Sequence, residues 1–335
     1  MKTIEIPAPD FDLAKTLDSG QVFHWEKADA GFVGTIGDQP VYVEQAGAVL
    51  KLRCELDCLN QSSFHETEDA TSKLGAIVAS ASSRSAGKHA QDADVTVSHY
   101  FALDHPLTEI CASFPNDPVM NAAREFCHGL RIIRQPKWEC LATFICSSMK
   151  QVAHIRQISR KLRERFGAVA RVAGRMVYTF PTAHRIAETS EKELRVCALG
   201  YRAPNLLRTA RLVVEGDADL EAWSTLSDAE LRERLCHLPG VGAKVANCVM
   251  LFAYERLGAF PIDVWIERVL RQNYFPRARK LNAARLRAFT QGYFGEHGGY
   301  AQQYLFHHAR KTAGRGRTAK AGDKVRRRNL SPSSS

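Results

Sequence analysis

The feature that most constrains the fold is a short segment, Leu238 to Gly242, in which two glycines flank one valine. Upstream, Ser227 and Glu230 have the spacing of an N-cap with a capping box, so we expect a helix to begin there and to end at Pro239-Gly240. We expect a second helix to begin near Gly242, where exposed N-terminal amides can bind a phosphate without any side chain. The segment predicts a helix-hairpin-helix over residues 228–257.

Such a hairpin grips the backbone of a nucleic acid whatever its base sequence. The apolar residues fit this reading, because Val245 and Val249 fall on the inner face of the second helix. Similar hairpins also serve as passive DNA grips, so a non-catalytic binding module remains an alternative at this point. The residues expected to form the turn and contact DNA are Gly240, Val241 and Gly242, with Val241 plugging the turn.

Three residue types with chemical potential lie in and after the second helix. Lys244 stands two places past the second glycine, beside the expected phosphate-binding loop. Cys248 lies four residues further on, so the two side chains share a helix face and can meet. Asp263 follows a short apolar segment, at the expected N-cap of the next helix. Lys244 can also be a solvated cation on a phosphate, and Asp263 can be a cap alone.

Together, these residues suit cleavage of an N-glycosidic bond. A carboxylate stabilises the positive charge that develops at C1′, and the helix N-terminus is expected to keep Asp263 ionised. A neutral Lys244 amine can capture C1′ as a Schiff base, after which β-elimination nicks the strand. Burial and the helix N-terminus favour the neutral amine, whereas Asp263 favours the charged one, so the balance stays open. The catalytic candidates are Lys244 and Asp263.

The segment from Leu238 to Asp263 resembles the helix-hairpin-helix, glycine/proline-rich loop and aspartate (HhH-GPD) motif of base-excision DNA glycosylases. A lysine at position 244 is the mark of the members that combine glycosylase and lyase activities. An endonuclease III-like protein is disfavoured, because the last cysteine is Cys248 and no four-cysteine iron–sulfur signature follows it. Further segments are similar to 8-oxoguanine DNA glycosylases in particular, namely Ser19–Trp25, Phe144–Ser148, Leu199–Ala203 and Ala301–Phe306.

The resemblance implies how a damaged base would be held. Gln302 and Phe306 lie four residues apart on an expected helix, so an amide and a ring face the same way. The resemblance makes Gln302 a contact to the Watson–Crick edge, and Phe306 and Cys248 the stacking walls. It makes the carbonyl of Gly20 the acceptor for the N7–H of 8-oxoguanine, a bond worth about 1–3 kcal/mol and too weak to explain full discrimination alone. Otherwise Phe306 is a core residue, Gln302 is solvated and Gly20 is a turn.

Other matched positions imply contacts to the rest of the duplex. Tyr201 resembles the wedge that fills the space left by the extruded base, and Arg202 resembles the arginine that reads the orphaned partner; either can otherwise be a surface residue. The sequence departs from the better-known relatives after Ser148, where Met149 replaces an asparagine and His154 an arginine. Since Met149 has no donor for a base edge, we expect relaxed opposite-base preference, with Arg202 carrying most of it. Trp265 replaces a phosphate-contacting histidine.

Composition supports a polyanionic partner only weakly. The formal net charge is +10, but residues 310–335 hold nine Lys/Arg and one Asp and so carry +8 of it. We expect no cofactor and no metal, and we expect a monomer that binds double-stranded DNA containing a damaged purine. The odd, scattered cysteines, the lack of a signal-peptide core and the lack of long apolar runs predict an intracellular protein away from membranes. It would lie on DNA, in the bacterial cytoplasm or nucleoid or in a eukaryotic nucleus.

The pattern along the chain predicts an α+β, mostly α fold. Residues 1–105 are expected to form a small antiparallel β domain with turns near residues 29–31, 37–38 and 46–47, and with a variable loop over 59–94. Residues 106–311 are expected to form the helical domain, built from two subdomains and containing the hairpin. One long helix is expected to carry Cys140 to Leu162. Residues 312–335 are expected to be a basic disordered tail.

The sequence therefore predicts a bifunctional DNA glycosylase and abasic-site lyase that removes 8-oxoguanine. One alternative is a glycosylase for other oxidised or alkylated bases. The other is a non-catalytic helix-hairpin-helix DNA-binding protein.

Overall fold

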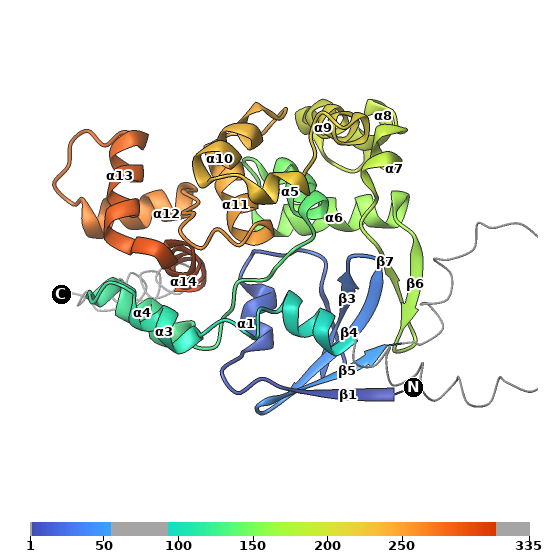
Figure 1. Ribbon diagram of the computed structural model, residues 1–335, viewed down its shortest axis with the longest axis horizontal. Helices are drawn as coiled ribbons and strands as arrows, with labels where there is room; N and C mark the ends of the chain where they lie inside the picture. Colours follow the sequence, from blue (N-terminus) through green and yellow to red (C-terminus); the bar gives the residue numbers. More distant parts are fainter. Residues whose placement is uncertain (1, 55–92, 313–335) are drawn as a thin grey trace, which may run out of the picture.

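The computed structural model describes residues 2–54 and 93–312. Its N-terminal part is a five-stranded antiparallel sheet with the strand order β1-β5-β4-β3-β2 (Figure 1). The strands are β1 (Lys2–Pro7), β2 (Glu26–Ala28), β3 (Gly31–Ile36), β4 (Gln39–Ala46) and β5 (Val49–Cys54). Tight turns join β2 to β3, β3 to β4 and β4 to β5, as the sequence predicts. The first strand, β1, pairs with the last, β5, so that Lys2 lies opposite Cys54.

The two faces of this sheet have different partners. Val41, Val43 and Leu52 pack with residues of the short helix α1 (Leu13–Asp18) in one buried cluster. Tyr42 faces the other way and packs against Val172. The alternation of neighbouring residues between two clusters is what a strand with both faces covered requires.

The second face is covered by a hairpin that the sequence analysis did not anticipate. Strands β6 (Val169–Val172) and β7 (Arg175–Tyr178) form a two-stranded antiparallel sheet. They lie beside β3 and β4 (Figure 1). The helical domain expected over residues 106–311 therefore contains a hairpin that the sequence pattern did not indicate, because two four-residue strands are too short to stand out from their helical surroundings.

The rest of the described chain is helical, which confirms the mostly α class. No helix within these residues is long and apolar enough to span a lipid bilayer. The α-helices are α3 (Leu107–Ala112), α4 (Pro118–Phe126), α5 (Lys137–Ser147), α6 (Val152–Phe166), α7 (Ala183–Ala187), α8 (Glu191–Val196), α9 (Ala203–Glu215), α10 (Asp228–His237), α11 (Ala243–Ala253), α12 (Val264–Val269), α13 (Ala283–Phe294) and α14 (Gly298–Thr312). Shorter helical turns are η2 (Gly200–Arg202), η3 (Ala222–Thr225), η4 (Leu270–Tyr274) and η5 (Gly295–His297).

The long helix expected over residues 140–162 is two helices. The α5 helix ends at Ser147, Ser148 adopts an extended ψ of 125°, and α6 begins only at Val152. Met149 between them has a φ of +53°, in the left-handed region. Because both helices have the same apolar spacing, the hydrophobic periodicity does not reveal the break between them.

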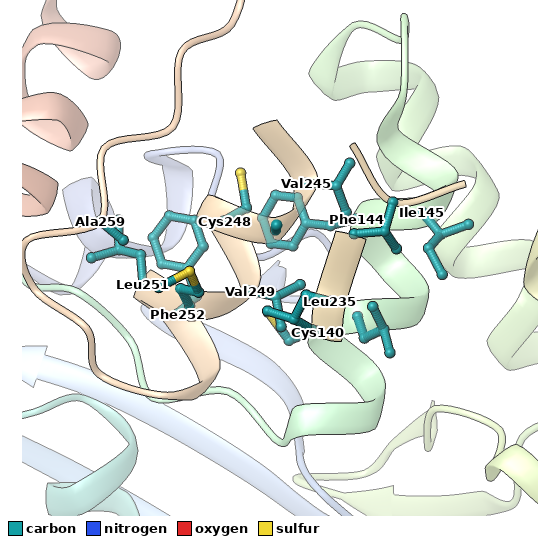
Figure 2. Packing of buried hydrophobic residues seen from close by; sticks show 14 of the residues in the cluster. Cys140, Phe144, Ile145, Leu235, Val245, Cys248, Val249, Leu251, Phe252 and Ala259 are labelled. Carbon is teal, nitrogen blue, oxygen red and sulfur yellow. The ribbon is translucent and has the colours of Figure 1, made fainter. Parts of the chain in front are cut away.

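One large buried cluster joins most of the helices. Helices α5, α10 and α11 meet at its centre, where Phe144 stacks on Phe252 with ring centroids 5.5 Å apart (Figure 2). Cys248 and Val249 of α11 belong to the same cluster. The helix that carries the candidate lysine is therefore fixed on its inner face by tightly packed side chains.

Two predictions fall largely outside the described residues. The loop expected over 59–94 is described only at residues 93–94, which are helical. The basic tail expected over 312–335 is described only at Thr312, the last residue of α14. The proposed domain limits at residues 105 and 311 stay predictions.

Candidate active site

The glycine-containing segment forms a helix-hairpin-helix. Ser227 caps α10 with the expected capping box to Glu230, and Gly242 is the N-cap of α11. Gly240 has a φ of +80°, which favours glycine at that point of the turn. Val241 is 6% exposed and fills the turn, with its amide donating to the Leu238 carbonyl. The predicted hairpin is thus present, and the amides at the start of α11 lie at its surface end.

Lys244 lies in the first turn of α11 and is half-buried. Its Nζ donates to the Ser147 hydroxyl at 3.3 Å and lies 5.1 Å from the ring centre of Phe144. It also interacts with the Cys248 thiol, as the four-residue spacing predicts. Burial raises the pKa of that thiol, and Lys244 opposes the rise, so Cys248 is a neutral, apolar neighbour of the amine.

Asp263 is the N-cap of α12, as predicted. Its Oδ1 accepts from the amides of Trp265 at 3.0 Å and Ile266 at 2.8 Å. Burial raises the pKa of Asp263, while those amides and the charge of Lys244 lower it, and the net direction is upward. The helix N-terminus was expected to keep Asp263 ionised; its amides do lower the pKa, but the loss of solvent raises it by more. The charges of Lys244 and Asp263 act on each other across this site.

Helix α14 brings the predicted base contacts together with the first part of the chain. Gln302 is 4% exposed, and its Oε1 has no hydrogen-bond partner among the described residues. Phe306 is half-buried against the large cluster that includes Cys248. Gly20 has a φ of +87°, and a Cβ there would lie 3.0 Å from Phe306 Cε1. We call Gly20, Cys248, Gln302 and Phe306 the base-binding cluster, a name for a role that stays a prediction. The alternative of a solvated Gln302 is excluded by its burial.

The two residues expected to contact the rest of a duplex differ in exposure. Tyr201 is 57% exposed, as a wedge must be, whereas Arg202 is 4% exposed. The Arg202 Nε donates to the Ser148 carbonyl at 2.8 Å, and its other nitrogens donate to the Leu199 carbonyl and the Tyr201 hydroxyl. The guanidinium also lies 4.1 Å from the centre of the Tyr201 ring. Reading an orphaned base would require exchange of these bonds, so that role stays a prediction that the present geometry does not favour.

The segment between α5 and α6 presents the remaining candidates. His154 is exposed in the first turn of α6. Met149 is 94% exposed in its left-handed conformation, next to the Ser148 carbonyl that Arg202 holds. Arg202 therefore holds the backbone of this loop in place through its bond to the Ser148 carbonyl.

Sequence reasoning assigned no role to Ser147, although it lay within one of the matched segments. Its hydroxyl contacts Lys244, which is 97 residues away in the chain. No short-range sequence pattern predicts such a contact. Within the part of the chain that the structure describes, no group of three or more His, Cys, Asp and Glu side chains is placed to hold a metal ion.

Comparisons with known proteins relate this chain to DNA glycosylases. Residues 3–141 match the family model described as the N-terminal domain of 8-oxoguanine DNA glycosylase, and residues 142–291 match the HhH-GPD superfamily of base excision DNA repair proteins. A probable N-glycosylase/DNA lyase of Methanothermobacter thermautotrophicus is 26% identical, covering 92% of this chain and 96% of its own. The N-glycosylase/DNA lyase OGG1 of Arabidopsis thaliana is 27% identical, covering 90% of this chain and 78% of its own.

A solved structure gives the same picture at the level of the fold. The Clostridium acetobutylicum 8-oxoguanine glycosylase/lyase, bound to duplex DNA with cytosine opposite 8-oxoguanine, superimposes with a TM-score of 0.75 and 27% identity. That match covers 92% of this chain and 98% of the other. The similarity therefore includes both the sheet and the helices, rather than the hairpin alone.

Proposed function

The chain belongs to the 8-oxoguanine DNA glycosylase family of the HhH-GPD superfamily, and from that premise we propose that it excises 8-oxoguanine from duplex DNA and then nicks the strand at the abasic site. The relatives named above are glycosylases with a lyase activity, and they match nearly the whole chain. The arrangement around Lys244 supports the same two steps.

The observation that carries the proposal is the unpartnered Oε1 of Gln302. A buried amide oxygen without a donor costs about 1–3 kcal/mol, so it calls for a ligand that supplies one. The Watson–Crick edge of 8-oxoguanine carries N–H donors, and the Phe306 ring on the next turn of α14 offers a stacking surface. The Gly20 carbonyl is proposed to accept the N7–H that distinguishes the damaged base from guanine.

Lys244 and Asp263 are proposed to perform the chemistry. The bond from C1′ to the base nitrogen breaks, the electron pair leaves with the base, and the ionised Asp263 stabilises the positive sugar. The Lys244 amine, once neutral, bonds to C1′ and loses a proton; the C1′–O4′ bond then breaks, O4′ takes up a proton, and a protonated Schiff base between Lys244 and C1′ remains. Removal of the C2′ proton then breaks the bond to the 3′ phosphate oxygen. The adjacent Ser147 hydroxyl holds the amine near its reacting position.

DNA binding is proposed to come from the hairpin and from the exposed wedge. The amides at the N-terminus of α11 would take a backbone phosphate between Gly240 and Gly242. Tyr201 would enter the duplex, and His154, which is exposed in the first turn of α6, would contact the DNA. We propose that the protein acts as a monomer on double-stranded DNA.

The test is a panel of duplexes that each carry one defined lesion. We expect release of 8-oxoguanine and a nick, with little activity on undamaged guanine and with modest differences among the four opposite bases. Lys244→Gln should abolish the nick, whereas Lys192→Gln, an exposed lysine on α8, should behave like the unchanged protein. Preference for an alkylated or another oxidised base would replace the proposed substrate. Binding without release of any base would favour a passive DNA-binding protein.

A further inference from the structure

Helix α14 holds the loop that carries Gly20. The Gln303 Nε2 donates to the Ser19 carbonyl at 3.0 Å, and an Arg310 terminal nitrogen donates to the Asp18 carbonyl. These are the two carbonyls that immediately precede Gly20 in the chain. On the other side of Gly20, the Gln21 side chain donates at 2.8 Å to the carbonyl of Arg131, which lies between α4 and α5. The position of the Gly20 backbone is therefore determined by bonds to its neighbours on both sides.

Arg310 also contacts the aromatic member of the base-binding cluster. Its guanidinium carbon lies 5.7 Å from the centre of the Phe306 ring. Its NH1 lies 3.7 Å from the position that a Cβ on Gly20 would occupy. The side chain is 16% exposed, so most of its length is packed. One guanidinium therefore touches the backbone before Gly20 and the ring of Phe306 at once.

The carboxylate of Asp18 has two closer partners than Arg310. Arg156 lies 3.0 Å from its Oδ1, and Lys311 pairs with its Oδ2. Arg310 is 3.9 Å from the same carboxylate. Its closer bond is to the backbone carbonyl, which is the group that positions the following residues. Lys311 is therefore a matched neighbour that shares the charge and the carboxylate but has no recorded contact with Gly20 or Phe306.

We propose that Arg310 is a positioning residue that sets the separation between the Gly20 carbonyl and the Phe306 ring, and through it the recognition of the damaged base. This inference rests on the proposed function, since it assumes that the two groups hold the same base. Arg310 itself touches neither the base nor the sugar in this account.

A purine stacked on Phe306 fixes its distances to the ring and to the Gly20 carbonyl together. A base that lies against Phe306 presents its N7–H along one direction, and a hydrogen bond weakens steeply once its length or angle departs from the optimum. A loop that shifts by about 1 Å can lower a rate by as much as about a hundredfold, even when the reacting groups are intact. Nicking of a site that has already lost its base does not use this arrangement.

The experiment compares Arg310→Met, Arg310→Lys and Lys311→Met with the unchanged full-length chain. Single-turnover excision is measured on an 8-oxoguanine duplex, and β-elimination on a duplex with a preformed abasic site. We expect Arg310→Met to excise about tenfold to a hundredfold more slowly while nicking the abasic site within about twofold of normal. Arg310→Lys, which keeps a donor for the Asp18 carbonyl but loses the flat guanidinium, should recover part of the excision. Lys311→Met should change neither rate.

If the unchanged chain excises 8-oxoguanine, two results would overturn the role of Arg310 without affecting the proposed function. One is normal excision by Arg310→Met. The other is an equal loss of both activities together with a lower unfolding temperature, which would make Arg310 a residue of general stability. If the unchanged chain nicks abasic sites but leaves 8-oxoguanine in place, the proposed function itself fails and takes this inference with it.

Discussion

The Nζ of Lys244 lies 3.3 Å from the hydroxyl of Ser147, and that hydroxyl donates its own proton to the Phe144 carbonyl at 2.7 Å. The hydroxyl oxygen must therefore accept from the amine, so that one amine proton points toward α5. The same amine lies over the Phe144 ring. Helix α5 thus orients the candidate nucleophile of α11.

The first prediction concerns this contact. Ser147→Ala removes the acceptor and should slow formation of the covalent intermediate about threefold to tenfold, because a neutral hydrogen bond contributes about 0.5–1.5 kcal/mol. The rate of borohydride trapping under single-turnover conditions measures it. Ser148→Ala is the control, since that residue serves Arg202 through its backbone carbonyl. An unchanged trapping rate in Ser147→Ala would show that Lys244 needs no support from the Ser147 hydroxyl.

The second prediction separates the two roles of Asp263. Asparagine is as good an N-cap as aspartate, so Asp263→Asn should keep the bonds to Trp265 and Ile266. Because burial raises the pKa of Asp263, the stability linked to its proton is complete at low pH and is lost as pH rises through the folded pKa. The variant should therefore be no less stable at neutral pH. Excision should nevertheless fall about a hundredfold or more, because the sugar loses its counter-charge.

The pH profile checks the same residue. The proposed mechanism requires ionised Asp263, so excision should decline as the pH is lowered, along a limb that lies above the ordinary pKa of aspartate. The residual activity of Asp263→Asn should lack this limb. A variant that unfolds more easily yet excises normally would make Asp263 a cap and nothing more.

The third prediction distinguishes the two glycines of the hairpin. Gly240 has a φ of +80°, and a Cβ there would lie 2.8 Å from Asn205 Nδ2. Gly240→Ala should therefore lower the free energy of unfolding by about 1–2 kcal/mol or more. Gly242 has an ordinary φ of −98°, and a Cβ there would meet no described atom within 4 Å. Gly242→Ala should change stability by only about 1 kcal/mol or less, the cost of a poorer cap.

DNA affinity supplies the second readout for this pair. In Gly242→Ala the new methyl group stands where a phosphate would approach the α11 amides, so we expect affinity for duplex DNA to fall about tenfold. Urea unfolding and a fluorescence titration measure the two quantities on the same samples. Equal DNA affinity in Gly242→Ala and the unchanged chain would argue that the hairpin does not bind the backbone.

The fourth prediction concerns Met149. Asparagine adopts the left-handed conformation more readily than methionine and can donate to a base edge. Met149→Asn should therefore raise the unfolding temperature slightly and increase the excision rate opposite cytosine relative to adenine. Met149→Gly relieves the backbone in the same way but offers no donor, so it should leave the base preference unchanged. Equal shifts in both variants would assign the effect to loop conformation alone.

Local patterns along the chain predicted the elements whose signals are short-range. The β-hairpins were predictable because turn residues stand between alternating strands, and the capping box at Ser227 was predictable from two residue types at one spacing. The pairing of Lys244 with Cys248 followed from the helical repeat alone. Each of these depends on residues that are close in sequence.

The features that the sequence did not predict depend on backbone conformation or on contacts between residues far apart in the chain. The break at Met149 has a left-handed residue without a glycine, inside an uninterrupted apolar pattern. The burial of Arg202 follows from its bonds to a loop that lies 54 residues earlier. Arg310 reaches Asp18 across 292 residues. Such contacts arise from tertiary packing, and the sequence pattern does not predict them.

The measurement that tests the central claim most directly is borohydride trapping on an 8-oxoguanine duplex, followed by mapping of the adduct. We predict a covalent protein–DNA adduct at Lys244 that disappears in Lys244→Gln, while that variant still binds the duplex. An adduct of equal yield in Lys244→Gln, or no adduct from an unchanged chain that does release the base, would contradict the account.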